Sequence, residues 1–305
     1  MALGLEGLCF DQLHIDVARN TTDDFNPFHD PRRWQLIREN PFGSPIVLGF
    51  QTAFLISDRV EALHRGKHGV PGSDAFPLAF SNYEFRFVGA LRPGEVFDVQ
   101  LRKTVDKIAS GGGIATRALI RKQSGEPVLM GSVSETSTPK FLTDAKPTGL
   151  PRLAELADRQ PVPDSNYFLK RKYLTTSNGK NFVLAGLAAQ QDYFDELAEQ
   201  IAFPPLFTVA LASCALLEKG WQSGYDFHAD PVVYTTHQIS VDRRLQASLR
   251  SNDRLHLLVD GPLRVPDDRT SEPPAGSQTY HVFGLIADNA VLFRARMQLA
   301  NLHSH

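Results

Sequence analysis

The residues best suited to chemistry lie in one short segment near the start of the chain, residues 22–30, with the sequence TDDFNPFHD. Asp24 and His29 are separated there by a turn that Asn26 and Pro27 favour, because proline fixes its own φ and asparagine hydrogen-bonds local backbone. An imidazole has an ordinary pKa of about 6.5, so it can take and return a proton near neutral pH. The segment therefore predicts a carboxylate and an imidazole that converge on one water molecule.

Two similar stretches indicate the helices that must support such a pair. Residues 42–58, FGSPIVLGFQTAFLISD, and residues 203–219, FPPLFTVALASCALLEK, each read as a proline-containing loop followed by an apolar helix. At an offset of 161 residues, Gly49 falls on Ala210. Proline suits the first turn of a helix, and small residues allow a helix to lie close to a sheet. The chain is thus predicted to contain two copies of one unit.

Alternating strands follow each helix. Residues 83–105 alternate around a turn at residues 92–95, and residues 237–261 alternate around a turn at residues 250–253. Further strands are expected at 113–123 and 127–136 in the first half, and at 278–288 and 290–300 in the second. The predicted fold class is α+β, with two tandem units that each wrap an antiparallel sheet around a long central helix. Pairing the two sheets edge to edge would remove an exposed edge.

The domain boundaries follow from composition. Residues 143–164, TDAKPTGLPRLAELADRQPVPD, are rich in proline and polar residues and are predicted to be a linker. Residues 1–142 form the predicted N-terminal unit with the catalytic motif. Residues 165–305 form the predicted C-terminal unit.

The motif of the first half resembles a known family. DFNPFHD is similar to the D-x-N-P-x-H-x-D signature of the MaoC-like, or (R)-specific enoyl-CoA hydratase, family of hot-dog folds. SPIVLGF resembles that family's entry to the central helix, and LRPGE resembles its strand-turn segment. The resemblance covers about residues 10–137. It implies a double hot-dog fold and a hydratase or dehydratase of fatty acid metabolism that interconverts 3-hydroxyacyl and 2-enoyl thioesters.

The resemblance also implies roles for individual residues. Asp24 and His29 are expected to be catalytic, and the backbone amide of Gly49 is expected to stabilise the negative charge on the thioester oxygen. Ser57, two turns further along the helix, is expected to orient the catalytic carboxylate. Asn26 and Phe50 are expected to contact the substrate.

The second half lacks the motif. At the same offset Asp24 falls on Ala185 and His29 falls on Gln190, so this half is expected to be degenerate and structural. It would complete the sheet and shape an acyl tunnel. Candidates for the tunnel wall, or for plain core, are Phe203, Phe207 and Leu211.

Composition limits the possible partners. The net charge of -2 gives no reason to expect nucleic acid or an anionic membrane as a partner, and no apolar stretch reaches the length of a membrane span. Cys9 and Cys214 are expected to be free thiols, and the ten histidines have no metal-ligand spacing. We expect a cytoplasmic protein that is a monomeric double hot-dog or a homodimer. It would bind acyl-CoA or acyl-carrier protein and use no metal or cofactor, since CoA or phosphopantetheine is part of the substrate.

Two alternatives remain open for the function. Hot-dog folds also hydrolyse acyl thioesters with a carboxylate and a bound water, although hydrolysis does not require the histidine. The degenerate second half also fits a non-catalytic subunit that only binds acyl thioesters. Two basic runs, residues 170–172 and 243–244, are expected either to meet the phosphates of the substrate or to form a solvated face.

Overall fold

The structure is a computed structural model, and it describes residues 3–68, 78–263 and 276–302. Its strands are β1 (Leu3–Cys9), β2 (Phe80–Phe87), β3 (Val96–Leu101), β4 (Val105–Asp106), β5 (Ile114–Lys122), β6 (Pro127–Thr136), β7 (Gln160–Pro161), β8 (Phe168–Tyr173), β9 (Phe194–Asp195), β10 (Gln200–Ile201), β11 (Val232–Asp242), β12 (Arg254–Leu263), β13 (Ser277–Leu285) and β14 (Val291–Asn301). Its α-helices are α1 (Gln12–Thr22), α2 (Gly49–His68), α3 (Thr176–Ala185), α4 (Pro205–Ala210), α5 (Ala212–Gln222) and α6 (Arg243–Ser248). Two short 3-10 helices near the N-terminus are η1 (Pro27–His29) and η2 (Trp34–Leu36).

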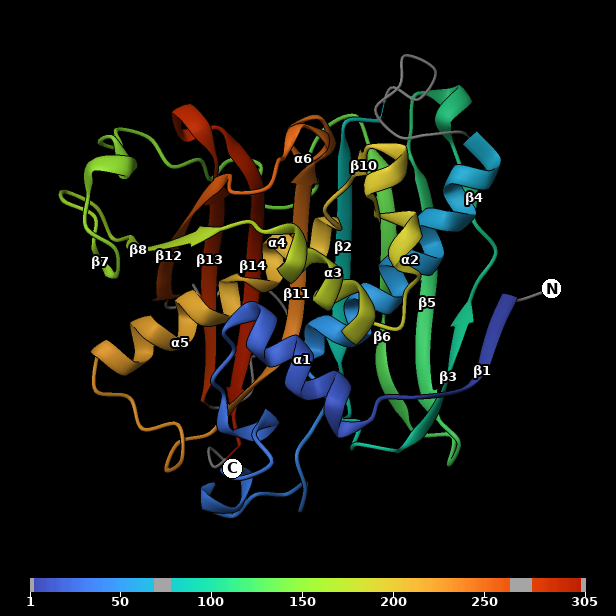
Figure 1. Ribbon diagram of the computed structural model, residues 1–305, viewed down its shortest axis with the longest axis horizontal. Helices are drawn as coiled ribbons and strands as arrows, with labels where there is room; N and C mark the ends of the chain where they lie inside the picture. The colour runs from blue at the N-terminus through green and yellow to red at the C-terminus, as the bar shows by residue number, and fades with distance from the viewer. Residues whose placement is uncertain (1–2, 69–77, 264–275, 303–305) are drawn as a thin grey trace.

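One large antiparallel sheet forms the frame of the molecule, and helices α1 to α5 lie on one face of it (Figure 1). The strand order is β1-β3-β5-β6-β2-β11-β14-β13-β12-β8-β7, with β4 paired to β5. The order from β1 to β2 is repeated in reverse from β11 to β8, so the sheet consists of two like halves. This arrangement is the double hot-dog that the sequence predicts.

The two halves meet at the pairing of β2 with β11, where Tyr83 lies opposite Ile239 and Asn82 lies opposite Ser240. The Ser240 hydroxyl donates to the Asn82 side-chain oxygen at 2.7 Å across this junction. The predicted edge-to-edge pairing is therefore confirmed, and an edge strand of each half is covered by the other.

Helix α2 is the central helix of the first half, and it is buried along most of its first three turns. Its buried residues there include four polar ones, Gln51, Thr52, Ser57 and Asp58, among the apolar side chains. Its N-terminus is fastened by Gln51, whose side-chain oxygen accepts from the Leu48 N–H at 3.2 Å. The Gln51 amide group also donates to the carbonyl of Ala185 at 2.9 Å, at the end of α3. One buried side chain thus ties the start of α2 to the second half.

The second half departs from the predicted pattern in two places. Its central helix is divided into α4 and α5 at Leu211, whose backbone remains helical at φ -61° and ψ -15°. The predicted strand region 237–261 also contains helix α6, which Asp242 caps through its side-chain oxygen to the N–H groups of Arg244 and Leu245. The alternating pattern continues on both sides of α6, which is why the sequence analysis missed it.

The segment predicted as a linker is ordered and packs against the sheet. Leu153 and Val162 are each 1% exposed and form a second apolar cluster with Leu258 and Phe283 of the C-terminal strands. The segment also contributes the short strand β7, which pairs with β8. The division of the chain at residues 142 and 165 stays a prediction.

Candidate active site

The predicted catalytic segment follows α1 and is held by its own hydrogen bonds. Helix α1 ends at Asp23, which takes a left-handed conformation with φ 52°. The Asp24 carboxylate accepts from the Asn26 N–H at 3.0 Å, and the Asn26 side-chain oxygen accepts from the Phe28 N–H at 3.1 Å. Pro27 begins η1, where its missing N–H is not needed. The residue types of the motif therefore fix a turn that carries Asp24 and His29.

His29 is 8% exposed and has a defined proton arrangement. Its Nδ1 lies 2.8 Å from the carbonyl oxygen of Ile46, which can only accept, so Nδ1 carries the proton and Nε2 presents a lone pair. Burial lowers the pKa of His29, although the charge of Asp24 and the Ile46 hydrogen bond oppose that shift. A neutral imidazole at pH 7 with a free Nε2 is the form that can act as a base.

Asp24 is 5% exposed, and its charge acts on His29 and on Tyr234 of β11. Burial and then the Asp24 charge raise the pKa of Tyr234, so this hydroxyl remains protonated. Tyr234 Oη lies 3.0 Å from Ser213 Oγ on α5. The carboxylate of the first half thus faces a hydroxyl pair from the second half.

Two cavities meet at this point. The larger, about 220 Å³, is lined by His29, Gly49 and Phe87 among others, and we call it the wide cavity. The smaller, about 40 Å³, is lined by Asp24 and by apolar residues of α5 and the C-terminal strands, and we call it the narrow cavity. Asn26 and Tyr234 line both. The motif therefore stands between the two spaces.

Gly49 is the first residue of α2 and lies in the wall of the wide cavity together with His29. The N–H groups of a first helical turn have no partner within the helix, and the helix dipole makes them favourable to negative charge. A Cβ at this position would lie 3.0 Å from the Phe87 ring, so glycine also relieves close packing. The location fits the predicted oxyanion role, which stays a prediction.

The other predicted site residues have different surroundings. Ser57 donates to the Glu61 carboxylate at 2.8 Å, so its proton is not directed at Asp24 as the resemblance implied. Glu61 lies one turn further along α2, and the predicted role of Ser57 in orienting the catalytic carboxylate stays a prediction. Phe50 is 2% exposed and packs on Tyr234 and His237 with ring centroids 5.9 Å and 4.5 Å away. Asn26 lines both cavities, while its amide group donates to the Val232 carbonyl at 3.2 Å.

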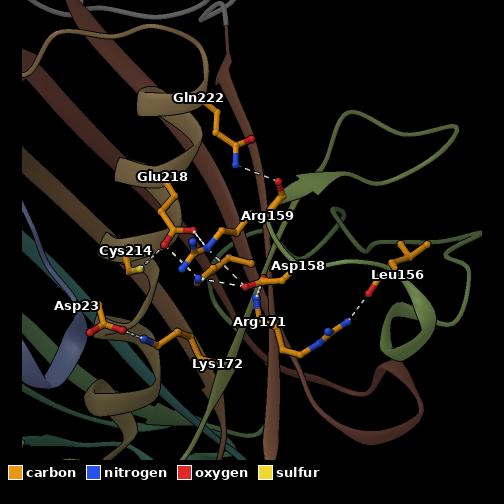
Figure 2. Close-up of polar contacts among 10 residues, drawn as sticks. Asp23, Leu156, Asp158, Arg159, Arg171, Lys172, Cys214, Glu218 and Gln222 are labelled. Atoms are coloured by element: carbon orange, nitrogen blue, oxygen red, sulfur yellow. Dashed lines mark hydrogen bonds and ion pairs between the residues drawn. The ribbon is translucent and has the colours of Figure 1, made fainter.

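Neither predicted interpretation of the basic runs fits the structure at most of their positions; Figure 2 shows Arg171 and Lys172 of the first run. Lys170 is 4% exposed and lies 3.0 Å from Glu218 and 3.2 Å from Asp158. Lys172 pairs with Asp23, and the Arg171 guanidinium donates to the Leu156 carbonyl at 2.7 Å. In the other run, Arg243 pairs with the buried Glu135 at 2.7 Å, and only Arg244 is exposed. Lys172 and Arg243 therefore join the second half to the first, and Lys172 fastens the end of α1 just before Asp24.

The proposed tunnel residues belong to the core. Phe203, Phe207 and Leu211 are 3%, 0% and 1% exposed and pack within the main apolar cluster. Tyr234 and Ser213 are instead the side chains of the second half that reach the candidate site, and the sequence analysis missed them. No local pattern marks them, because their position depends on how β11 and α5 pack against the motif.

Other site types were also considered. In the part of the chain that the structure describes, no three histidine, cysteine or acidic side chains cluster closely enough to bind a metal ion. No helix among the same residues is both long and apolar enough to cross a membrane. Cys9 and Cys214 are free thiols.

Comparison with solved structures identifies the fold. The chain is similar to a conserved hypothetical double hot-dog protein from Mycobacterium tuberculosis, with TM-score 0.60, 8% identity and coverage of 99% of this chain and 96% of that one. It is similar to a MaoC domain protein dehydratase from Chloroflexus aurantiacus, with TM-score 0.58, 10% identity and coverage of 99% and 95%. A MaoC-like dehydratase from Phytophthora capsici matches with TM-score 0.52, 13% identity and coverage of 97% and 94%.

At such low identity these matches establish the fold. No family model matches the sequence, and no curated protein matches it either. The chain has the double hot-dog fold found in MaoC-like dehydratases, as the sequence motifs predicted.

Proposed function

We propose that this protein is a hydratase or dehydratase that interconverts 3-hydroxyacyl and 2-enoyl thioesters of CoA or of an acyl-carrier protein. One observation supports this proposal above the others. His29, whose Nδ1 is bound to the Ile46 carbonyl, lies close enough to the buried Asp24 for that charge to raise its pKa, and it shares a cavity wall with the N-terminal glycine of a helix. These groups are what water addition beside a thioester carbonyl requires.

In the proposed chemistry each of these groups has one role. In the hydration direction, His29 Nε2 takes a proton from a water molecule that the Asp24 carboxylate orients by accepting its second hydrogen. The water oxygen bonds to Cβ, and the electron pair of the double bond moves through Cα to the thioester oxygen. The Gly49 N–H stabilises that enolate oxygen. The acid–base pair then returns one proton to Cα, so that one water has been added.

The two alternatives make different use of the same residues. A thioesterase would use Asp24 to activate a water molecule that attacks the carbonyl carbon. In that reaction the Nε2 of His29 would have no role. A subunit that only binds acyl thioesters would give no reason for a buried carboxylate beside an imidazole. The orientation of His29 by Ile46 therefore favours the hydratase.

One assay separates the three functions. The protein is incubated with crotonyl-CoA, and with the corresponding carrier-protein thioester, while enone absorbance and free thiol are followed together. Loss of enone without thiol supports the hydratase, thiol release supports a thioesterase, and saturable binding with neither signal supports a binding subunit. Asp24→Asn and His29→Ala should each remove activity while the protein stays folded; a variant with the wild-type rate refutes its assigned role.

A further inference from the structure

A groove of about 630 Å³ lies beside the candidate active site, and the proposed chemistry does not use it. Four aromatic side chains, Phe25, Trp221, Tyr225 and Phe227, contribute to its wall, and we call it the aromatic groove. Trp221 is 67% exposed and Phe25 is 39% exposed, which is unusual for large apolar side chains. The Phe227 ring contacts both the Tyr225 and the Phe25 rings, with centroids 4.9 Å and 6.2 Å away.

The aromatic groove is continuous with the catalytic motif. Tyr225 and Phe227 line the groove and also the narrow cavity that contains Asp24. Within the motif itself, Phe25 and Pro27 line the groove, whereas Asp24 and Asn26 line the narrow cavity. Tyr225 and Phe227 thus form a common wall between the narrow cavity that contains Asp24 and the open groove.

The charges of the groove argue against a phosphate-bearing ligand. Both arginines in its wall lie within 4 Å of a carboxylate: Arg33 and Asp30 at 3.9 Å, and Arg159 and Glu218 at 3.1 Å. Figure 2 shows the second of these pairs, together with Gln222, whose amide group donates to the Arg159 carbonyl at 3.0 Å. The phosphates of CoA would compete with these carboxylates, whereas a hydrocarbon chain would gain contact with exposed aromatic faces.

We propose that the aromatic groove receives the far end of a long-chain acyl group while the thioester is bound at the catalytic pair. This inference rests on the proposed function, because the direction of the substrate follows from the oxyanion site. A thioester carbonyl at Gly49 lies in the wide cavity, so CoA leaves on that side and the acyl chain continues past Asp24 into the narrow cavity.

The narrow cavity must widen when the chain enters. Its volume of about 40 Å³ is close to the roughly 30 Å³ that one water molecule occupies in the liquid. Tyr225 and Phe227, which separate it from the aromatic groove, are only half-buried. The Tyr225 hydroxyl donates to the Asp230 carbonyl at 2.7 Å, so opening this wall requires that hydrogen bond to break or the Phe227 ring to turn. Short acyl groups would end at this constriction and would not reach Trp221.

The two tryptophans of the chain make a direct test possible, since Trp221 lines the groove and Trp34, in η2, does not. Trp34→Phe leaves Trp221 as the only tryptophan, and Trp221→Phe leaves Trp34. Each variant is titrated with palmitoyl-CoA below its micelle concentration, with butyryl-CoA and with CoA alone. We expect palmitoyl-CoA to shift the Trp221 emission to shorter wavelength, with no shift from the other two ligands and none for Trp34.

A kinetic test uses charge in the groove. Trp221→Asp should raise KM for hexadec-2-enoyl-CoA about tenfold and leave crotonyl-CoA hydration unchanged, because only the long chain contacts residue 221. Leu184→Asp on α3 is the matched control, since Leu184 is also exposed, at 60%, but lies outside the groove. The control should leave both substrates unchanged.

The outcomes separate this inference from the proposed function. A Trp221 shift caused by CoA alone or by butyryl-CoA overturns the inference, because it places the nucleotide in the groove. Hydration of crotonyl-CoA without any response of Trp221 to palmitoyl-CoA also overturns it and leaves the hydratase proposal intact. A Trp221 response without hydration supports the acyl groove and rejects the hydratase.

Discussion

His237 offers a quantitative test of how the centre of the molecule is built. The side chain is 0% exposed in β11, and its ring lies against Phe50, Phe87 and Tyr234 with centroids 4.5 Å, 4.8 Å and 4.5 Å away. Neither ring nitrogen has a hydrogen-bond partner among the described residues. Burial alone lowers the pKa of His237 to about 3 from its ordinary value of 6.5.

The sign of the effect on stability follows from this shift. Because the folded pKa lies below the unfolded one, the unfolded chain binds a proton first as the pH falls. Stability is therefore lost as the pH decreases from 6.5 towards 3. With these two pKa values, proton linkage at His237 removes about 2 kcal/mol of unfolding free energy between pH 7 and pH 5.

The perturbation is His237→Leu, which removes both the unpartnered nitrogens and the titration. At pH 7 we expect the variant to be more stable by about 1 kcal/mol, because an unsatisfied buried polar group is replaced by an apolar one. At pH 5 the advantage should grow to about 3 kcal/mol, measured by urea unfolding at both pH values. His281→Leu is the control, since this half-buried ring should give a smaller change. An equal difference between wild type and His237→Leu at the two pH values would refute the reasoning.

Three further predictions concern the candidate site. Asp24→Asn keeps the acceptor for the Asn26 N–H but removes the charge that opposes the fall in the His29 pKa. Activity should drop about 10²- to 10⁴-fold, and the acid limb of the pH profile of the residual kcat/KM should move to lower pH. Gly49→Ala and Gly49→Pro place the same Cβ near Phe87, but only proline removes the N–H; an oxyanion role predicts that Pro is about 10²-fold slower than Ala in kcat, and equal rates contradict it. Tyr234→Phe removes a protonated hydroxyl that faces Asp24; kcat should fall about tenfold with little change in KM, whereas a change in KM alone indicates a role in binding only.

The parts that could be predicted from the sequence are those that local interactions determine. Asp24, Asn26 and His29 lie within six positions, and their turn is built from hydrogen bonds between neighbours. The start of α2 at Gly49 was also predicted, because a proline-containing loop followed by an apolar run is a local signal. The same local pattern of loop, helix and alternating strands occurs twice in the sequence, and this repeat predicted that the sheet has two like halves.

The parts that could not be predicted depend on contacts between distant segments. Lys170 reads as a surface cation in the sequence, but Glu218 and Asp158 surround it only because α5 and the preceding loop fold over β8. The Ser57 hydroxyl donates to Glu61, and the position of Ser57 on its helix face does not by itself predict this acceptor. Tyr234 reaches Asp24 from a strand more than two hundred positions away.

The second half differs from the first at the position that corresponds to the predicted catalytic motif. At the end of α3, Leu187 has the same left-handed conformation, φ 58°, that Asp23 has at the end of α1, φ 52°. If these two residues are matched, Asp24 corresponds to Ala188, and not to Ala185 as the offset of 161 residues predicted. A Cβ on Gly186 would lie 2.1 Å from the Phe54 ring, so α2 packs closely against the end of α3. By the same match His29 corresponds to Tyr193, whose hydroxyl donates to Asp58 of α2 at 3.0 Å, so a contact with α2 occupies the position of the imidazole.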